Sequence, residues 1–589
     1  MLRPRDTAHR EAARRGLPPV VGTDVLRRGA LVFLFVAALL SGLPGQGFWG
    51  LHGEGRRAEV GREVYADGQW LVPTLLGKPF ITKPPLLYWA IGGTFRLTGG
   101  VSEFRARLPG LAATVGTLLL VMALGRLGAL PRPGQPSPPA GAPGLSPAGR
   151  AERCGLAAGL AFASSPLVLG MGRMAETEPL LLFFSTLSVY AYARIPPGAS
   201  ALEATRWRLL LAAALTAGFL VKGPLGWIFP LLGVGAMEAL SAAGQRRLRW
   251  TDALFLAGAT AALALPWFVA VARRVPHAVG TWLGESVSRL DPDFPTHREP
   301  AWYYLPGLAS FGPWALLLPA ALRGLPHAWK DREAQTAGPV LWLLAGVVFL
   351  SLAASKRTHY LLSLAPAYAL AVAPLLVDGL SSSTARRALV AVLGRALWIF
   401  PAGLLGAALF LGAVRRVIGP GEAAVLVLGA GAIGAFLWGS RRGWLPWTLA
   451  TTLCASAAVA GLGLLPAVDA YRSPRAFFQE ARGLVGPAEP VWNWQTDRFS
   501  SSFYLGRHVA PLRTVEELAA AAPRGAWLFT SSHGEPPVPP GAEIALARIA
   551  RDPFFPRRQQ GWYLLRWSPT LGGDGQGAPS GEAVQAGGG

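Results

Sequence analysis

The sequence has little charge and almost no cysteine. Only 15% of its 589 residues are Asp, Glu, Lys or Arg, whereas 51% are hydrophobic, and the mean hydropathy is +0.35. So little charge excludes a chain that is water-soluble over most of its length, and it indicates a polytopic membrane protein. The two cysteines, Cys154 and Cys454, both lie in apolar segments, which excludes a disulfide framework and a thiolate metal cluster.

The sequence also lacks basic runs interleaved with aromatic residues, although its formal net charge is +22. Its arginines fall mainly between apolar segments, where they set membrane topology. We therefore expect no nucleic-acid partner.

Apolar runs of roughly 17 to 25 residues are the unit that spans a membrane. We expect about thirteen such spans, with approximate centres at residues 36, 115, 163, 187, 215, 232, 262, 311, 346, 369, 401, 431 and 456. The first run follows a basic tail without a small-residue cleavage site, so we expect a retained helix rather than a signal peptide. The expected fold is mainly α, a membrane helical bundle.

The arginine pattern orients these spans. With the amino terminus in the cytoplasm, the basic loops at 126–153, 206–208, 246–249, 323–332, 386–387 and 441–442 are all cytoplasmic. Arg415 and Arg416 fall on the outer side, and nothing in the sequence explains them.

The same orientation defines the expected domains. They are a cytoplasmic basic tail (1–28), a transmembrane domain (29–467) with a first outer loop (46–104), an outer soluble α/β domain (468–569) and a disordered tail (570–589). In the α/β domain we expect one helix to start at Ser473-Pro474, another at the capping box Thr514-x-x-Glu517, and a strand at "GAWLFT". Trp492, Trp494 and Tyr504 fit either its core or a sugar-binding surface.

Several polar residues come out on the outer face, close to the ends of apolar helices. Besides the loop 46–104 they are Arg173, Glu178, Lys222, Lys356 and His359. Polar groups that gather at one membrane face from separate loops indicate one composite site.

The segment "PFITKPPLLYWA", residues 79–90, contains a lysine followed by two prolines. Pro84 and Pro85 suit the first turn of a short helix, whose free N–H groups, together with Lys83, favour an anion. That anion is either a lipid headgroup met by chance or a bound phosphate. Upstream, Arg56, Glu59 and Glu63 recur at helical spacing and fit a solvated helix face. Glu54, between two glycines, fits a turn that presents a carboxylate, as a general base would be presented.

The run "GEGRRAEVGREVYADGQWLVPTLLGKPFITKPPLLYW" resembles the first outer loop of GT-C glycosyltransferases of the protein mannosyltransferase and aminoarabinose transferase-like family, glycosyltransferase family 39-like. "GRMAETEPLLLFF", "FLVKGPLG", "THREPAWYYLP" and "SKRTHYLLSLAPAYAL" are also similar to family segments. The resemblance covers residues 27 to about 380.

The resemblance implies a hexosyl or pentosyl transferase of the bacterial cell membrane. It would move a sugar from a polyprenyl-phosphate donor to a lipid, glycan or protein acceptor on the outer face, with inversion. Lys83, Lys356 and Arg298 would contact the donor phosphate, and Glu54 and Glu178 would be the catalytic carboxylates. Arg56, Arg173, Lys222 and His359 are further candidates. Lysines and arginines at such positions also fix topology or reach toward headgroups.

The sequence departs from the family at the Glu and His that are associated with a bound metal in aminoarabinose transferases. Thr82 stands where aminoarabinose transferases carry Glu, and Ser286 stands where they carry His. We therefore expect no zinc site and no cofactor, and the departure argues against lipid A as the acceptor. The family aspartate that precedes Glu54 is Gly53 here.

Two alternatives remain open. An oligosaccharide-to-protein transferase would need a divalent metal and a larger outer domain. A flippase or transporter of lipid-linked sugars would place charges near the membrane midplane and show repeated halves, and we find no internal repeat.

Overall fold

The computed structural model describes residues 20–48, 53–128, 147–197, 200–241, 246–287, 299–330, 334–353, 355–378, 394–440, 444–496, 499–551 and 559–569. The chain forms two compact units. Unit 1 contains Met1–Gln46 and Val60–Pro466, and unit 2 contains Gly47–Glu59 and Ala467–Gly589. Arg298, residues 1–19 of the basic tail and the tail 570–589 lie outside the described residues.

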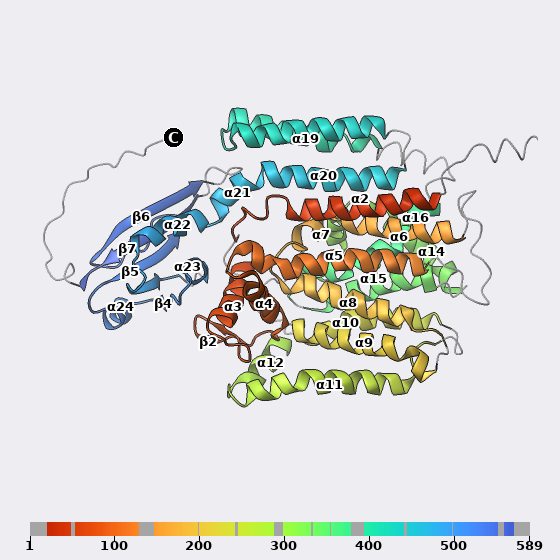
Figure 1. Cartoon of the computed structure of the whole chain (residues 1–589), viewed down its shortest axis with the longest axis horizontal. Coiled ribbons are helices and arrows are strands. Elements are labelled where there is room, and N and C mark those ends of the chain that lie inside the picture. Colours follow the sequence, from red (N-terminus) through yellow and green to blue (C-terminus); the bar gives the residue numbers. More distant parts are fainter. Residues whose placement is uncertain are drawn as a thin grey trace, which may run out of the picture. The chain divides into compact units, whose positions relative to one another are not determined.

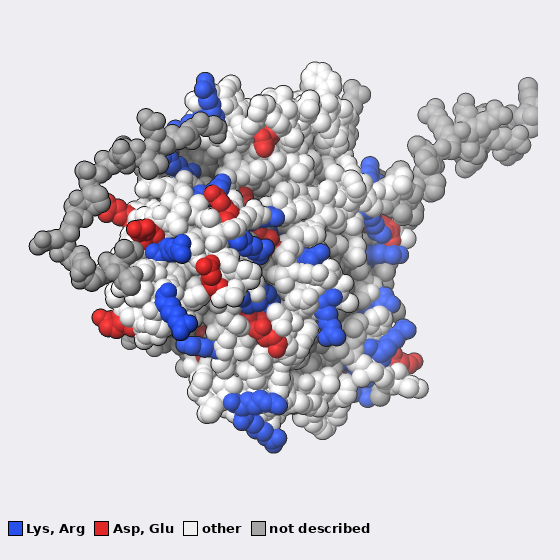
Figure 2. Space-filling model, turned by 60° about the vertical axis from the view of Figure 1, so that its left-hand side comes forward, with Lys and Arg blue, Asp and Glu red and all other residues white. Residues whose placement is uncertain are grey.

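Unit 1 is built from helices. Its longer ones are α2 (Val20–Leu40), α5 (Glu103–Gly128), α6 (Pro147–Ala163), α8 (Thr177–Arg194), α9 (Ala201–Lys222), α10 (Leu225–Ala239), α11 (Trp250–Ala272), α14 (Leu318–Lys330), α15 (Ala334–Leu352), α16 (Ala365–Asp378), α19 (Pro420–Gly439) and α20 (Leu445–Gly463). Most run side by side (Figure 1), with α5 packed on α6 and α8, and α8 on α9. A helix satisfies its own backbone hydrogen bonds, so apolar sequence takes this form in a membrane. Figure 2 shows wide uncharged areas between the charged side chains.

The number of long apolar helices is smaller than the expected number of spans. Seven described helices are long and apolar enough to cross a membrane, or eight if one bent pair counts as a single span. Every expected centre lies in a helical segment. Several of these segments are short, however, such as α10 with 15 residues and α6 with 17.

The apolar segment expected to span the membrane around residue 311 is helical but bent. The helices Ala301–Phe311 and Pro313–Lys330 meet at an angle of 114°. The break falls at Gly312, whose φ of 88° is a backbone angle that glycine adopts readily and other residues rarely do. The following Pro313 has no backbone N–H, so it cannot continue the hydrogen bonding of the preceding helix.

Unit 2 contains a five-stranded sheet with strand order β4-β3-β5-β7-β6. The strands are β3 (Val491–Trp494), β4 (Pro511–Leu512), β5 (Ala526–Ser532), β6 (Ala542–Arg551) and β7 (Gln559–Trp567). β3 is parallel to β4 and β5, whereas β7 is antiparallel to β5 and β6. The expected small α/β domain is confirmed.

Helices pack on this sheet through apolar side chains. Leu518 of α24 (Val515–Ala521) joins a core cluster with Trp494 and Leu528, while Phe478 of α22 (Arg475–Leu484) contacts Phe529. α23 (Phe499–Leu505) carries Tyr504, which stacks on Phe478.

The local expectations for this domain are confirmed. Thr514 caps α24 with Glu517, α22 follows Ser473-Pro474, and "GAWLFT" forms β5. Trp494 and Tyr504 are buried, so both belong to the core and not to an open sugar-binding surface.

Unit 2 also includes the start of the segment that is expected to form the first outer loop. Gly47 N donates to Asp469 Oδ1 at 2.8 Å, and the Phe48 ring lies edge-on to Phe503 with centroids 4.9 Å apart. A Cβ on Gly47 would lie 1.9 Å from Ser473 Oγ, so only glycine fits there. Gly47 and Phe48 therefore pack with the carboxy-terminal domain although they are distant from it in sequence.

Candidate active site

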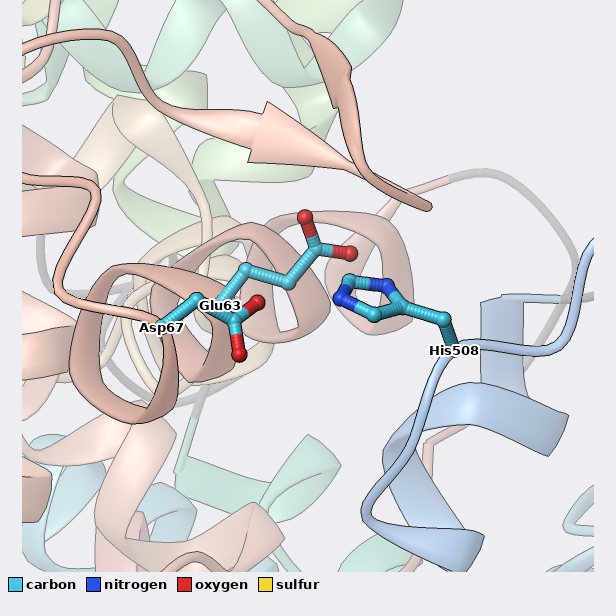
Figure 3. Close-up of side chains that lie close together, drawn as sticks. All are labelled: Glu63, Asp67 and His508. Atoms are coloured by element: carbon cyan, nitrogen blue, oxygen red, sulfur yellow. The ribbon is translucent and has the colours of Figure 1, made fainter.

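A buried carboxylate shapes the loop that leads to Lys83. β1 (Thr74–Leu75) and β2 (Lys78–Pro79) form a two-residue hairpin in which both Leu76 and Gly77 have positive φ. Glu63 accepts hydrogen bonds from both turn amides, at 2.6 Å from Leu76 N and 3.3 Å from Gly77 N. Glu63 lies on α3 (Glu54–Ala66), one turn before Asp67 (Figure 3).

The expected solvated helix face is therefore wrong. Glu59 and Glu63 are both fully buried, and Arg62 is almost so. Spacing alone showed that these residues share a helix, but it did not show that the hairpin turn folds back onto Glu63.

Three tryptophans hold the same loop through their indole N–H groups. Trp89 donates to Trp70 O, Trp267 donates to Leu71 O at 2.9 Å, and Trp282 donates to Ile81 O at 2.9 Å. Trp267 lies on α11 and Trp282 on α12 (Ala278–Val287). Backbone on both sides of the hairpin is thus fixed to three helices.

Lys83 follows this anchored backbone directly. As expected, Pro85 is the N-cap of a helix, α4 (Leu86–Thr98). Lys83 Nζ lies 2.7 Å from Glu285 Oε2 on α12 and donates to Thr82 O at 3.1 Å. The side chain is only 18% exposed, so this lysine binds an oxyanion in a sheltered position and is not a loose surface charge.

A second charged cluster joins α8, α9 and the 3-10 helix η5 (Thr358–Leu364). Lys222 Nζ lies 2.7 Å from Glu178 Oε1, and His359 Nε2 lies 3.6 Å from the same oxygen. Lys222 also lies 4.7 Å from the centroid of the Tyr360 ring. Glu178 is buried and the side chain of Lys222 is only 7% exposed, and an ion pair so desolvated is costly to break by removing one partner.

Lys356 is buried and lies three residues before His359 in the sequence, but its ammonium group donates to backbone carbonyls. Its Nζ donates to Glu299 O at 2.9 Å and to Ala353 O at 2.5 Å. It therefore ties the segment after α15 to the segment before the broken helix pair.

Arg173 and Arg56 lie elsewhere. Arg173 donates to Ser41 O at 2.9 Å and to Gln46 Oε1 at 3.1 Å, while Arg107 donates to Gln46 O at 2.7 Å. Arg173 and Arg107 thus hold the chain where it leaves α2. Arg56 is half-buried on α3, in the part of that helix that belongs to unit 2.

Glu54 does not occupy the expected turn. It is the first residue of α3 and only 4% exposed, and it belongs to unit 2. The flanking glycines suggested a turn, yet Gly53 is the last residue before the helix and Gly55 lies within it. A carboxylate at the first position of a helix interacts favourably with the helix dipole.

The structure thus brings together Glu178, Lys222 and His359 in unit 1, and it pairs Lys83 with Glu285. Sequence reasoning missed Glu285 as a partner, because the two residues are 202 positions apart. It also missed Trp267 and Trp282, whose role depends on tertiary contacts that no local pattern signals. A lysine held rigidly beside an oxyanion is suited to stabilise a departing phosphate.

Known proteins resemble this chain in sequence. Residues 144–280 match the family model of dolichyl-phosphate-mannose-protein mannosyltransferase. An undecaprenyl phosphate-alpha-4-amino-4-deoxy-L-arabinose arabinosyl transferase of Edwardsiella ictaluri is 30% identical over 479 residues, which are 77% of this chain and 79% of that protein. The enzyme of the same description from Pseudomonas aeruginosa is 31% identical over 341 residues, 56% of each chain.

A solved structure resembles it in fold. It is ArnT from Cupriavidus metallidurans bound to undecaprenyl phosphate, which superposes with a TM-score of 0.68 at 19% identity and covers 94% of this chain and 99% of that one. The apo form of the same protein superposes equally well, at 20% identity.

Proposed function

Because the chain belongs to the aminoarabinose transferase-like family of GT-C membrane glycosyltransferases, we propose that it moves a sugar from undecaprenyl phosphate, or a closely similar polyprenyl phosphate, to an acceptor outside the cell membrane. Its activity as a lipid-linked sugar transferase is the premise, and the identity of the sugar, the acceptor and the reacting residues is the proposal. The observation that carries the proposed site is that Lys83 Nζ contacts an oxyanion, the Glu285 carboxylate, at 2.7 Å.

Lys83 binds the phosphate of the donor. During transfer the bond between the anomeric carbon and the phosphate oxygen breaks, and the bonding electron pair leaves with the phosphate. The ammonium group of Lys83 stabilises this growing negative charge, and the loop held by three tryptophans keeps it in place before the reaction starts.

Glu54 is the proposed general base. An acceptor hydroxyl attacks the anomeric carbon from the face opposite the phosphate while its proton passes to the Glu54 carboxylate, so the anomeric configuration inverts. Attack, proton transfer and departure of the phosphate balance without an added cofactor, and we keep the prediction that no metal takes part.

The cluster of Glu178, Lys222 and His359 is proposed to contact the sugar or the acceptor. It offers a carboxylate acceptor, an ammonium donor and an imidazole in one place, a set suited to sugar hydroxyls. Arg298, Lys356, Arg56 and Arg173 stay candidates for further donor contacts. For Lys356 and Arg173, the backbone contacts described above favour a supporting role.

The test is release of polyprenyl phosphate by the full-length protein in nanodiscs, supplied with a panel of polyprenyl-phosphate sugars and membrane extract as acceptor. We expect Lys83→Ala to lower the rate about 100-fold or more, through loss of phosphate stabilisation. Glu54→Ala should lower it by about 10²- to 10⁴-fold, mainly in kcat. Glu480→Ala, an exposed carboxylate of unit 2, is the matched control and should react like wild type.

The same assay tests the absence of a metal, since a chelator should leave the wild-type rate unchanged. Full activity of both the Lys83 and Glu54 variants would overturn the assigned site. Movement of a labelled lipid-linked sugar across vesicles without any release of polyprenyl phosphate would instead favour a transporter.

A further inference from the structure

Glu285 occupies the position on Lys83 that a donor phosphate needs. Its Oε2 lies 2.7 Å from Nζ, a distance typical of a strong charge-assisted hydrogen bond. Glu285 lies on α12 and is 35% exposed, whereas the lysine is the more sheltered partner. The anion that meets Lys83 in this structure is therefore supplied by the protein itself.

The backbone near both members of this ion pair is held by neighbouring side chains. Ile81, two residues before Lys83, accepts the Trp282 indole N–H at 2.9 Å, and it lies in one apolar cluster with Trp267 and Ala278. These contacts hold the backbone near both partners, whereas the position of the Glu285 carboxylate also depends on its own side-chain torsions. Rotation about those torsions moves the carboxylate relative to Lys83 without a shift of α12.

A phosphate and the Glu285 carboxylate cannot both remain within hydrogen-bonding distance of one ammonium group at low cost. The two anions would lie only a few ångströms apart in a partly desolvated place, where like charges repel strongly. Binding of either one thus weakens binding of the other.

We propose that Glu285 is a built-in counter-anion that competes with polyprenyl phosphate for Lys83, so that it gives way to the incoming donor and helps to expel the phosphate product. This inference rests on the proposed role of Lys83. It makes Glu285 a positioning residue that sets product release, and it does not place Glu285 in contact with the reacting sugar.

The competition predicts that a substitution near the proposed site raises the affinity for polyprenyl phosphate instead of lowering it. Glu285→Gln keeps the size and hydrogen-bonding capacity of the side chain but removes its charge. Polyprenyl phosphate should then bind about 3- to 5-fold more tightly, the gain expected for losing one partly exposed competing charge. Product inhibition should strengthen by the same factor. A residue that only supported α12 would weaken binding when replaced.

The experiment titrates undecaprenyl phosphate into the full-length protein in nanodiscs and follows tryptophan fluorescence. Glu422→Gln, at the start of α19, removes one negative charge away from Lys83 and serves as the control. We expect tighter binding by Glu285→Gln alone, and no such gain when Glu285→Gln is added to Lys83→Ala. Equal or weaker binding by Glu285→Gln, or the same gain in the Lys83→Ala background, would overturn the proposal.

This readout is separate from that of the proposed function. Binding is measured without donor sugar or acceptor, so a failure of Glu54 or of a chosen donor leaves it unaffected. If wild type and Lys83→Ala bind undecaprenyl phosphate equally, the proposed role of Lys83 itself fails and the inference fails with it.

Discussion

At the scale of single residues, the charges that matter here are at least partly buried and have a polar partner. Glu63 holds a turn, Lys83 meets Glu285, and Glu178 meets Lys222. In a low-dielectric interior an ionised group is stable only with a partner, so each of these contacts constrains both structure and chemistry.

Variants of the Glu178–Lys222 pair distinguish its contribution to stability from its proposed contribution to sugar transfer. Lys222→Met leaves Glu178 charged and buried without its ammonium partner, and we expect a loss of about 3–5 kcal/mol of stability, seen as a lower Tm in nanodiscs. The double variant Glu178→Gln/Lys222→Met removes both charges and should regain most of that stability.

Activity of the double variant then reports on function. We expect it to stay at least about 10-fold below wild type, because the proposed sugar contacts are gone. A double variant that is both stable and fully active would remove Glu178 from the catalytic residues.

At the scale of elements, one close helix contact positions Lys222. α9 ends at Lys222, the chain reverses through Gly223 with φ of 61°, and α10 packs back against α9. A Cβ on Gly226 would lie 2.1 Å from the backbone of Gly218, so the two helices touch backbone to backbone. Small residues allow such an approach between membrane helices.

Gly226→Ala should push α9 and α10 apart and move Lys222 away from Glu178. We expect a cost of about 1–3 kcal/mol in stability together with reduced sugar transfer, measured as Tm and as release of polyprenyl phosphate. Gly235→Ala on the same helix is the control. Its Cβ would meet nothing within 4 Å, so it should be neutral or slightly stabilising. Equal behaviour of the two variants would show that the close contact does not matter.

At the scale of the whole molecule, the expected topology makes a prediction that the fold itself leaves open. With the amino terminus in the cytoplasm, the loop before α9 lies inside and the α/β domain lies outside. The two native cysteines are both buried, so an introduced cysteine is a clean reporter.

We expect a membrane-impermeant maleimide to label Glu543→Cys, on exposed β6, in intact cells whose outer barrier is permeabilised. Thr205→Cys, exposed at the start of α9, should be labelled only after the cell membrane is opened. The reverse pattern would place the α/β domain in the cytoplasm and contradict the proposed outer reaction.

Local sequence patterns predicted several elements of the fold. The capping box at Thr514, the helix after Pro85 and the strand at "GAWLFT" were predictable because each depends on a few adjacent residues. The burial of Glu63 was not, because it depends on a hairpin turn that folds back onto its carboxylate. Glu54 was expected in a turn because its two flanking glycines indicated a break in the chain, but the helix begins at Glu54 and continues through Gly55.

The sequence by itself determined that this is a helical membrane protein with a small α/β domain, and its first-loop motif identified the glycosyltransferase family. Both follow from hydropathy and from residue order, which are properties of the chain alone. Only the tertiary structure decided which charges meet, namely Lys83 with Glu285 and Glu178 with Lys222 and His359. These pairs join residues distant in the chain, and their energy depends on burial and distance, which no linear pattern contains.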